Sequence, residues 1–329
     1  MKTQPIGEFS TPAEAARLKG KYDHERMQSE LRTATRESWS KQRSYNEHGV
    51  GAETEADWRC LALRSPGGDP SRTDPGGPGP ELFSDTKWMS ELPYLREVLN
   101  SIPAPMHAVR LMALGPGTVG MTHDDPKYSP KYGVLRLHIP VVTNPDARTI
   151  LDGKPHHWEP GEFWFGDFSR LHHVENLGPE HRTHLVMDTL AVPGTASLFP
   201  EEWSEYFASG DVLFNRQPSP LREDEMRKFE CDLKIPFGFT LWEEYWPLEG
   251  HADDEQASIR LDASGLALSP TDGQPIVLVH VGDGEFRFSG WSEERTIQLF
   301  PGGPNPTAVL RLRAGRDVIE RVIPIRPTP

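Results

Sequence analysis

Short apolar runs separated by turn residues dominate the middle of the chain. Runs rich in β-branched, aliphatic and aromatic residues occupy positions 108–114, 134–142, 149–151, 162–165 and 184–190. Glycine, proline, asparagine and aspartate cluster between the runs, for example at 115–117, 143–146 and 159–161. Short strands at this spacing are typical of a β enclosure, so we expect a double-stranded β-helix, a cupin-like jelly roll with flanking helices.

The regions before and beside this core follow other patterns. Thr11-Pro12-Ala13-Glu14 has the composition of a helix N-terminus, and the stretch behind it, poor in helix breakers, predicts a helix from residue 13 to about 39. Residues 65–80 contain five glycines and five prolines and predict a loop. Short helical patterns follow at 94–100 and 201–207.

The pattern starts again beyond residue 215. A tryptophan-rich stretch with Trp242 and Trp246 precedes alternating runs at 275–281, 285–289, 296–300, 308–312 and 317–325. We interpret this region as a second, sandwich-like β domain. The predicted division is therefore an N-terminal helical segment packed on the core (1–60), a jelly-roll domain (61–214) and a C-terminal β-rich domain (215–329). Substrate binding, dimerisation and simple support of the core are all open as roles for the last domain.

Composition narrows the class of protein. With 329 residues, of which 36% are hydrophobic and 26% charged, the chain can bury a core. Its 35 Lys plus Arg against 49 Asp plus Glu give a formal net charge of −14. Phosphate backbones and anionic lipids repel such a surface, so we expect no nucleic-acid partner and no membrane partner. The oligomeric state stays open.

Cysteine usage and apolar segments bear on the compartment. The two cysteines, Cys60 and Cys231, are too few for a disulfide framework or a thiolate-rich metal site. No apolar run approaches the roughly 20 residues of a membrane span, and the N-terminus lacks the basic-then-apolar order of a signal peptide. We therefore expect a cytoplasmic protein.

Candidate metal ligands lie in the predicted jelly roll, where nine of the 13 histidines fall between residues 107 and 184. His123 and Asp125 stand in H-x-D spacing, which directs both side chains to the same side of an extended backbone. A second pair, His172-His173, follows Asp125 with 46 residues between Asp125 and His172. Two histidines and one carboxylate on one octahedral face leave three positions for a chelating cosubstrate and dioxygen, as in non-heme Fe(II) oxygenases.

An arginine completes the pattern. Arg182 stands ten residues after His172 and would lie on the next strand, directed into the same barrel. Its guanidinium fork can bind the distal carboxylate of 2-oxoglutarate bidentately. H-x-D alone is common, whereas the whole string on predicted short strands favours a metal site over surface histidines in a solvated acidic turn.

These residues resemble a known family. The segment from about residue 82 to 188 is similar to the aspartyl/asparaginyl β-hydroxylases, particularly the bacterial branch that includes the proline cis-hydroxylases. Besides the His123/Asp125 pair, the matching strings are FSDT at 83–86, YLREVL at 94–99, VRLM at 109–112, GPG at 115–117, RLHIPVVTNP at 136–145, HHVEN at 172–176 and RTHLVMD at 182–188.

The resemblance implies an Fe(II)- and 2-oxoglutarate-dependent dioxygenase with six site residues. The implied iron ligands, and catalytic centre, are His123, Asp125 and His172. The implied cosubstrate contacts are Arg182, which anchors the distal carboxylate, and Arg136 and His138. His173 is the rival of His172, but only His172 fits the family's H-x-V pattern and the offset to Arg182. The animal members lack the carboxylate ligand, so Asp125 places this chain with the bacterial branch.

The family acts on amino acids, free or within peptides. The C-terminal β-rich region has no counterpart in the single-domain proline hydroxylases, and an added domain beside a jelly-roll mouth favours a peptide substrate. The acidic surface would attract a basic or amine-bearing partner. We therefore predict hydroxylation of an amino-acid side chain within a peptide, such as a peptide natural product. Aspartate is the leading candidate for the hydroxylated residue. A free amino-acid (proline-type) hydroxylase and a non-catalytic cupin-like binding module are the alternatives.

Several further residues keep two interpretations. Trp58 lines the cosubstrate pocket or belongs to the core, and His184 faces the site or is structural. Lys127, Tyr128 and Lys131 follow the H-x-D turn and are candidates to contact an anionic group of the substrate.

Overall fold

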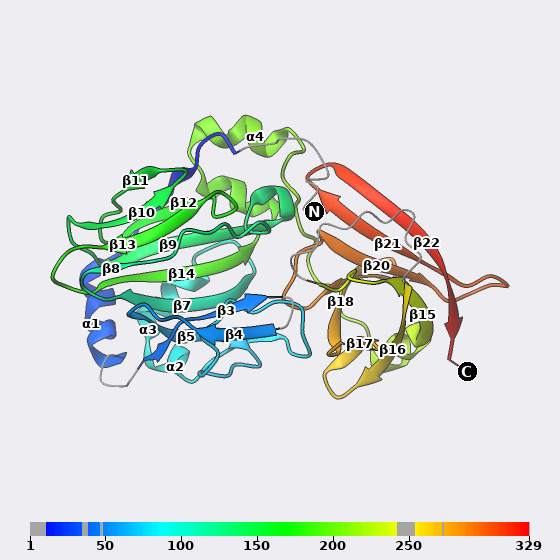
Figure 1. Cartoon of the computed structure of the whole chain (residues 1–329). Coiled ribbons are helices and arrows are strands. Elements are labelled where there is room, and N and C mark those ends of the chain that lie inside the picture. The colour runs from blue at the N-terminus through cyan, green and yellow to red at the C-terminus, as the bar shows by residue number, and fades with distance from the viewer. Residues whose placement is uncertain (1–10, 35–38, 47–48, 242–253, 272, 329) are drawn as a thin grey trace.

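Two β-rich bodies stand side by side in the computed structural model, with the first body built before residue 191 and the second after residue 230 (Figure 1). The structure describes residues 11–34, 39–46, 49–241, 254–271 and 273–328. Trp242 and Trp246, which marked the start of the second region in the sequence, lie outside the described residues.

The first body is a jelly roll made of two sheets, which confirms the predicted core. The larger sheet runs, in spatial order, β1 (Ala15–Lys21), β12 (Glu162–Gly166), β9 (Val134–Val142), β14 (Arg182–Leu190), β7 (Met106–Leu114), β5 (Trp58–Pro66) and β2 (Ser40–Lys41), with β6 (Phe83–Asp85) paired to β5. The smaller sheet runs β11 (Lys154–His156), β10 (Ala147–Leu151), β13 (His172–Asn176) and β8 (Thr118–Val119). A separate hairpin, β3 (Arg43–Asn46) and β4 (Gly49–Glu53), completes this body.

Alternation along the central strands separates the core from the site. In β14 every residue is buried, because β9 and β7 flank the strand and both of its faces are covered. Leu185 and Met187 belong to the hydrophobic core, as do the odd-numbered leucines of β9. The intervening positions of the same strands, Arg182 and Val186 among them, line a cavity instead. The two faces of one sheet therefore carry the core and the candidate site.

Helices pack against the core face of the larger sheet. Met27 and Leu31 of α1 (His24–Ala34) and Leu95 of α3 (Pro93–Asn100) are buried in the same cluster as the sheet leucines, and α2 (Trp88–Glu91) joins them. Shorter helical elements are η1 (Pro130–Tyr132), η2 (Pro193–Leu198), η3 (Glu201–Trp203), α4 (Ser204–Ala208), α5 (Glu223–Met226) and η4 (Arg227–Phe229). The predicted helices at 94–100 and 201–207 are confirmed, and so is the loop from residue 67 onward.

The predicted N-terminal helix is wrong over its first part. Residues 15–21 form β1, which pairs with β12 at the edge of the larger sheet. Ala16 and Leu18 are buried while Arg17 and Lys19 are exposed, so the burial period is two and not that of a helix. The described part of the helix begins only at His24 and ends at Ala34. The first 60 residues thus supply strands to the core sheet as well as a helix packed on it, and β5 runs across the predicted boundary at residues 60 and 61.

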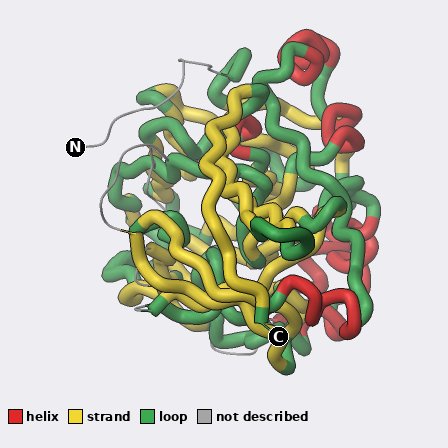
Figure 2. Tube along the Cα trace, turned by 90° about the vertical axis from the view of Figure 1, so that its right-hand side faces the viewer, coloured by secondary structure: helices red, strands yellow, loops and turns green. Residues whose placement is uncertain are grey.

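The second body is a closed barrel and not the sandwich that the sequence suggested. Its strands are β15 (Cys231–Pro236), β16 (Asp254–Asp262), β17 (Gly265–Pro270), β18 (Ile276–Gly282), β19 (Glu285–Phe288), β20 (Arg295–Phe300), β21 (Thr307–Ala314) and β22 (Asp317–Pro327). Closure follows because β15 pairs with β16 on one side and with β22 on the other. The barrel strands form the near part of the molecule when it is turned by 90° (Figure 2). Across the described ranges, no helix is both long and apolar enough to cross a membrane.

Candidate active site

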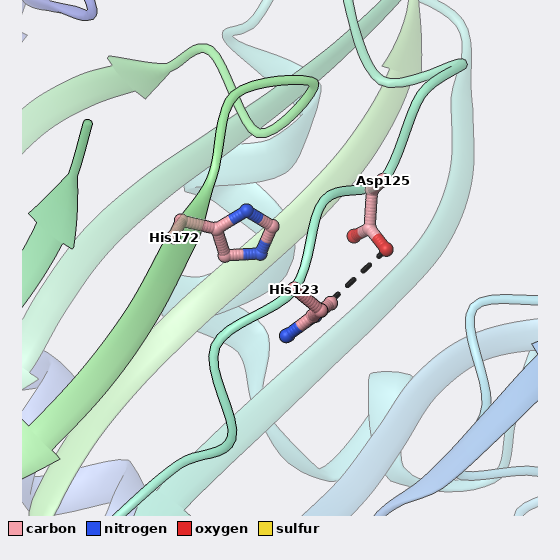
Figure 3. A group of neighbouring side chains, drawn as sticks. All are labelled: His123, Asp125 and His172. Atoms are coloured by element: carbon pink, nitrogen blue, oxygen red, sulfur yellow. Dashed lines mark ion pairs between the residues drawn. The ribbon is translucent and has the colours of Figure 1, made fainter.

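Backbone pairing brings the two predicted histidine ligands together. His123 lies in the segment between β8 and η1, and it forms an isolated antiparallel bridge with His172, the first residue of β13. The His123 N–H donates to the His172 carbonyl at 3.0 Å, and the His172 N–H donates back at 2.8 Å. Figure 3 shows the two imidazoles and the Asp125 carboxylate facing one another. One ligand atom from each of the three residues lies within 4.8 Å of the others.

Hydrogen bonds to backbone carbonyls determine the tautomer of both histidines. His123 Nδ1 lies 2.9 Å from the Met121 carbonyl oxygen, and His172 Nδ1 lies 2.8 Å from the Arg170 carbonyl oxygen. Because a carbonyl oxygen only accepts, each Nδ1 carries the proton and donates it. Each Nε2 consequently has a free lone pair, the state in which histidine binds a metal ion.

The Asp125 carboxylate is oriented by its backbone and by a cation. Its N–H donates to the Phe168 carbonyl at 2.9 Å, and Oδ2 accepts a hydrogen bond from Arg136 at 2.5 Å. Oδ1 lies 3.9 Å from His123 Nε2 and is turned toward the histidines. Burial alone would raise the pKa of Asp125, but Arg136 and the two histidines outweigh burial and lower it. Burial lowers the pKa of His172 to about 4. Asp125 and His172 are therefore in the deprotonated form that a metal ion requires.

Arg136, predicted as a cosubstrate contact, lies against the carboxylate of Asp125, the predicted ligand. It lies on β9 directly opposite Asp188 of β14. Its Nε donates to Asp188 Oδ1 at 2.6 Å, while Arg110 donates to the other oxygen of Asp188 at 2.9 Å. Arg136 is thus clamped between two carboxylates, and its role toward the cosubstrate stays a prediction.

Arg182 has a different environment. Its side chain is 3% exposed, and one guanidinium nitrogen donates to Thr149 Oγ1 at 2.9 Å. Among the described residues no carboxylate pairs with it, and burial lowers its pKa to about 9. A buried cation without a counter-ion is costly, so this position fits a ligand carboxylate such as the distal one of 2-oxoglutarate.

His138 also presents an unused polar atom. It is 4% exposed, and its Nε2 has no hydrogen-bond partner among the described residues. Burial holds the pKa of His138 well below its usual range, so the ring is neutral. The ring of His184, on the next strand, approaches with Nδ1 3.5 Å from His138 Nδ1. An orphaned nitrogen in a pocket is a candidate contact for a polar ligand, as predicted for His138.

A single cavity of about 510 Å³ contains all six predicted site residues. Trp58 lines it too, with its indole nitrogen buried and without a hydrogen-bond partner among the described residues. His173 is not among the lining residues, because neighbouring residues of a strand point to opposite faces. Lys127 is predicted to meet an anionic substrate group, and this is wrong: its Nζ is buried against Glu294.

Sequence reasoning missed one wall of this cavity. The β3–β4 hairpin and its flanking residues contribute to the lining, and they are Gln42, Ser44, Tyr45, Ala52, Glu53 and Thr54. A second cavity of about 480 Å³ shares only Tyr45 with the first and reaches Gly273 and Gln274 of the barrel. No motif marks the hairpin, and its place over the cavity follows from folding alone.

Comparison with known proteins bears on what this constellation does. The sequence profile of the aspartyl/asparaginyl beta-hydroxylase family matches residues 21–191, which is 171 of the 329 residues. The chain belongs to this family. Comparison with curated proteins found no significant match.

Partial structural likenesses also exist. An oxidoreductase of the 2OG-Fe(II) oxygenase family from Burkholderia pseudomallei is 13% identical, with a TM-score of 0.30 over 41% of this chain and 68% of that one. A predicted oxalate decarboxylase from Thermotoga maritima is 19% identical, with a TM-score of 0.21 over 29% and 73%. A cupin-superfamily sugar phosphate isomerase from Silicibacter pomeroyi is 16% identical, with a TM-score of 0.20 over 53% and 74%. With TM-scores this low, these structures say nothing about activity.

Family membership and the convergence of ligand atoms define the class of enzyme. The β-hydroxylase family match and the His-Asp-His group make this protein a 2-oxoglutarate-dependent dioxygenase, with Fe(II), 2-oxoglutarate and dioxygen as its cofactor and cosubstrates. Its reaction is a hydroxylation, and its substrate is an amino acid or a peptide.

Proposed function

We propose that this β-hydroxylase hydroxylates an amino-acid side chain within a peptide, with aspartate as the leading candidate for the target residue. His123, Asp125 and His172 are the proposed iron ligands. The observation that carries the proposal is the convergence of two free Nε2 lone pairs and one oriented carboxylate within 4.8 Å, in the cavity that also holds Arg182. A binding module that uses no metal has no physical need for this combination.

Each residue has a distinct task in this proposal. Bound Fe(II) and 2-oxoglutarate supply the oxidising chemistry, in which one atom of dioxygen enters a substrate C–H bond and the other enters succinate as CO₂ is lost. Arg182, supported by Thr149, binds the distal carboxylate of 2-oxoglutarate. The unpaired Nε2 of His138 contacts the cosubstrate, and the hydrogen bond from Arg136 holds the Asp125 carboxylate in place. The protein aims one C–H bond at the metal and excludes water.

The second cavity supports a peptide over a free amino acid. It shares the lining residue Tyr45 with the first cavity and is also lined by Gly273 and Gln274 of the barrel, so a substrate longer than one residue has a second cavity next to the first to contact. Glu53 and Asp124 line the first cavity in addition to the ligand carboxylate. Their charges favour a target residue that is flanked by basic or amine-bearing groups.

Turnover with defined substrates tests this function. We expect succinate formation and the mass gain of one oxygen atom with Fe(II), 2-oxoglutarate and aspartate-containing peptides with lysine neighbours, and little turnover of free aspartate or proline. His123→Ala abolishes both signals. Equal or better turnover of free proline would replace the peptide proposal by the free amino-acid one. Absence of succinate with every substrate, together with unchanged iron affinity in His123→Ala, would leave only a binding module.

Two further proposals concern context. We propose a cytoplasmic location, because Cys60 and Cys231 are both free and buried, which suits a reducing compartment. We also retain the division at residue 215, because the strands that follow it close into a barrel, in which Phe286 and Phe288 are almost fully buried.

A further inference from the structure

The residues that follow the proposed iron ligand Asp125 lie against the C-terminal barrel. This stretch, residues 126–133, is called the anchor segment below. Lys127 Nζ donates a 2.6 Å hydrogen bond to Glu294 Oε1, across 167 residues of sequence. The two side chains are 1% and 5% exposed, so the ion pair is shielded from water. A shielded pair of this kind has one favourable geometry and is suited to fixing a register.

Four successive carbonyls of the anchor segment are held from outside it. Each accepts a hydrogen bond either from the barrel or from the connection that leads to the barrel. The donor and carbonyl pairs are Leu213 N–H with Pro130, Gly315 N–H with Lys131, Ser292 Oγ with Tyr132, and Asn215 Nδ2 with Gly133. The backbone of the segment is therefore positioned residue by residue.

The anchor segment also contacts residues of the candidate metal centre. The Tyr128 N–H donates to the Asp125 carbonyl at 2.9 Å, which closes a turn directly after the ligand. The Arg136 guanidinium lies 3.9 Å from the centre of the Tyr128 ring. Arg136 in turn donates to Asp125 Oδ2. A shift of the anchor segment would therefore move both the backbone of the ligand and the cation that orients its carboxylate.

We propose that the barrel is a positioning domain for the metal centre, and that Lys127 and Glu294 are positioning residues that act on Asp125 through the anchor segment. The inference rests on the proposed function only in taking Asp125 as an iron ligand. It assigns the barrel a role within the site, which neither substrate binding nor dimerisation requires. Loss of such outer support around a metal ligand typically costs about 10- to 100-fold in metal affinity.

The test measures the affinity of the metal-free protein for Co(II), a probe ion that is insensitive to oxygen. Binding is followed by absorbance as Co(II) is added. Lys127→Met removes the ion pair, and Ser292→Ala removes the hydroxyl that donates to the Tyr132 carbonyl and accepts from the Glu294 N–H. Arg321→Met is the control, because its 2.7 Å bond to Asp254 joins two barrel strands, β22 and β16. We expect Lys127→Met to weaken Co(II) binding about 10- to 100-fold. Ser292→Ala should weaken it by a smaller factor, and Arg321→Met should leave it within twofold of the wild type.

Hydrogen exchange separates positioning from a general loss of stability. Peptides covering 126–133 should exchange faster in Lys127→Met and Ser292→Ala, while peptides from β9 and β14 keep wild-type protection. Lys127→Arg should recover most of the lost affinity. Should Lys127→Met fail to fold, Ser292→Ala decides alone. A folded variant with faster exchange in 126–133 and Co(II) affinity within twofold of the wild type overturns the proposal. If the wild type binds no Co(II), or His123→Ala binds it equally well, the metal assignment under Proposed function fails instead.

Discussion

The replacement of Arg182 by methionine should have opposite effects on the empty and the loaded protein. In the empty protein the guanidinium is buried, with Thr149 as its hydrogen-bond partner and no ion pair among the described residues. Burial lowers its pKa from 12.5 to about 9. At about 1.4 kcal/mol per pH unit, this difference disfavours the charged form by roughly 5 kcal/mol. Apolar replacements of buried ion pairs have stabilised proteins by about 1–4 kcal/mol, and we expect a gain of that order when the uncompensated charge of Arg182 is removed from the empty protein.

The loaded protein should lose its response to 2-oxoglutarate. Hydrogen bonds that involve charged groups contribute about 1.5–3 kcal/mol each, so loss of a bidentate contact should raise the Kd for 2-oxoglutarate by about two to four orders of magnitude. In the wild type, ligand at 100 times its Kd adds about 2.7 kcal/mol of stability. The same concentration should add almost nothing to Arg182→Met.

Urea unfolding with and without 2-oxoglutarate, in the presence of Co(II), measures both effects in one experiment. Arg182→Lys is the matched control, because it keeps the charge but loses the planar fork and should retain part of the response. An Arg182→Met protein that keeps the full 2-oxoglutarate response would refute the anchor assignment. A less stable empty variant would refute the reasoning about the uncompensated charge.

Three further predictions concern other buried polar groups. Arg136→Met should weaken Co(II) binding by about 10- to 100-fold, because Asp125 loses its orienting cation, and a titration that gives wild-type affinity would contradict this. Burial lowers the pKa of His184 far below 6.5, so the unfolded chain binds a proton that the folded chain does not, and stability falls as the pH drops below about 6.5. Between pH 6.5 and 5, the unfolding free energy of the wild type should fall with pH more steeply than that of His184→Gln, by up to about 1.4 kcal/mol per pH unit. Identical slopes would show that His184 is not the buried neutral histidine responsible for this loss. Burial raises the pKa of both Cys60 and Cys231 to about 12, so a thiol reagent at pH 8 should label neither until the protein is unfolded, and rapid labelling of the native protein would be the contrary result.

The local pattern of hydrophobic and polar residues was sufficient to predict individual strands and short helices in the centre of the chain. The runs at 108–114 and 134–142 lie in β7 and β9, because uninterrupted apolar stretches of this length suit strands that are covered on both faces. Pattern failed at 15–21, where helix-compatible residues form an edge strand. The pairing of Ala15, Ala16 and Arg17 with β12, about 150 residues away, outweighs local propensity there.

Charge and chemical type could be assigned to the site residues from sequence, but their partners could not. Arg136 and Arg182 are the same residue type on neighbouring regions of one sheet. Strand register places Arg136 opposite Asp188 and leaves Arg182 beside a threonine hydroxyl. One arginine therefore supports the candidate ligand, and the other presents an uncompensated charge to the cavity.

By itself the sequence determined the central strands at 108–114 and 134–142, their apolar positions, and which imidazoles and carboxylates are available for a metal ion. These follow from residue type and from the two-residue period of a strand, both of which are local. The tertiary structure decided the bridge between His123 and His172, the hairpin wall around Tyr45, and the closure of the barrel by β15 and β22. It also decided that Lys127 turns to Glu294 and away from any substrate. Contacts across tens to hundreds of residues depend on sheet register and on the packing of whole domains, and no spacing of neighbouring residues encodes them.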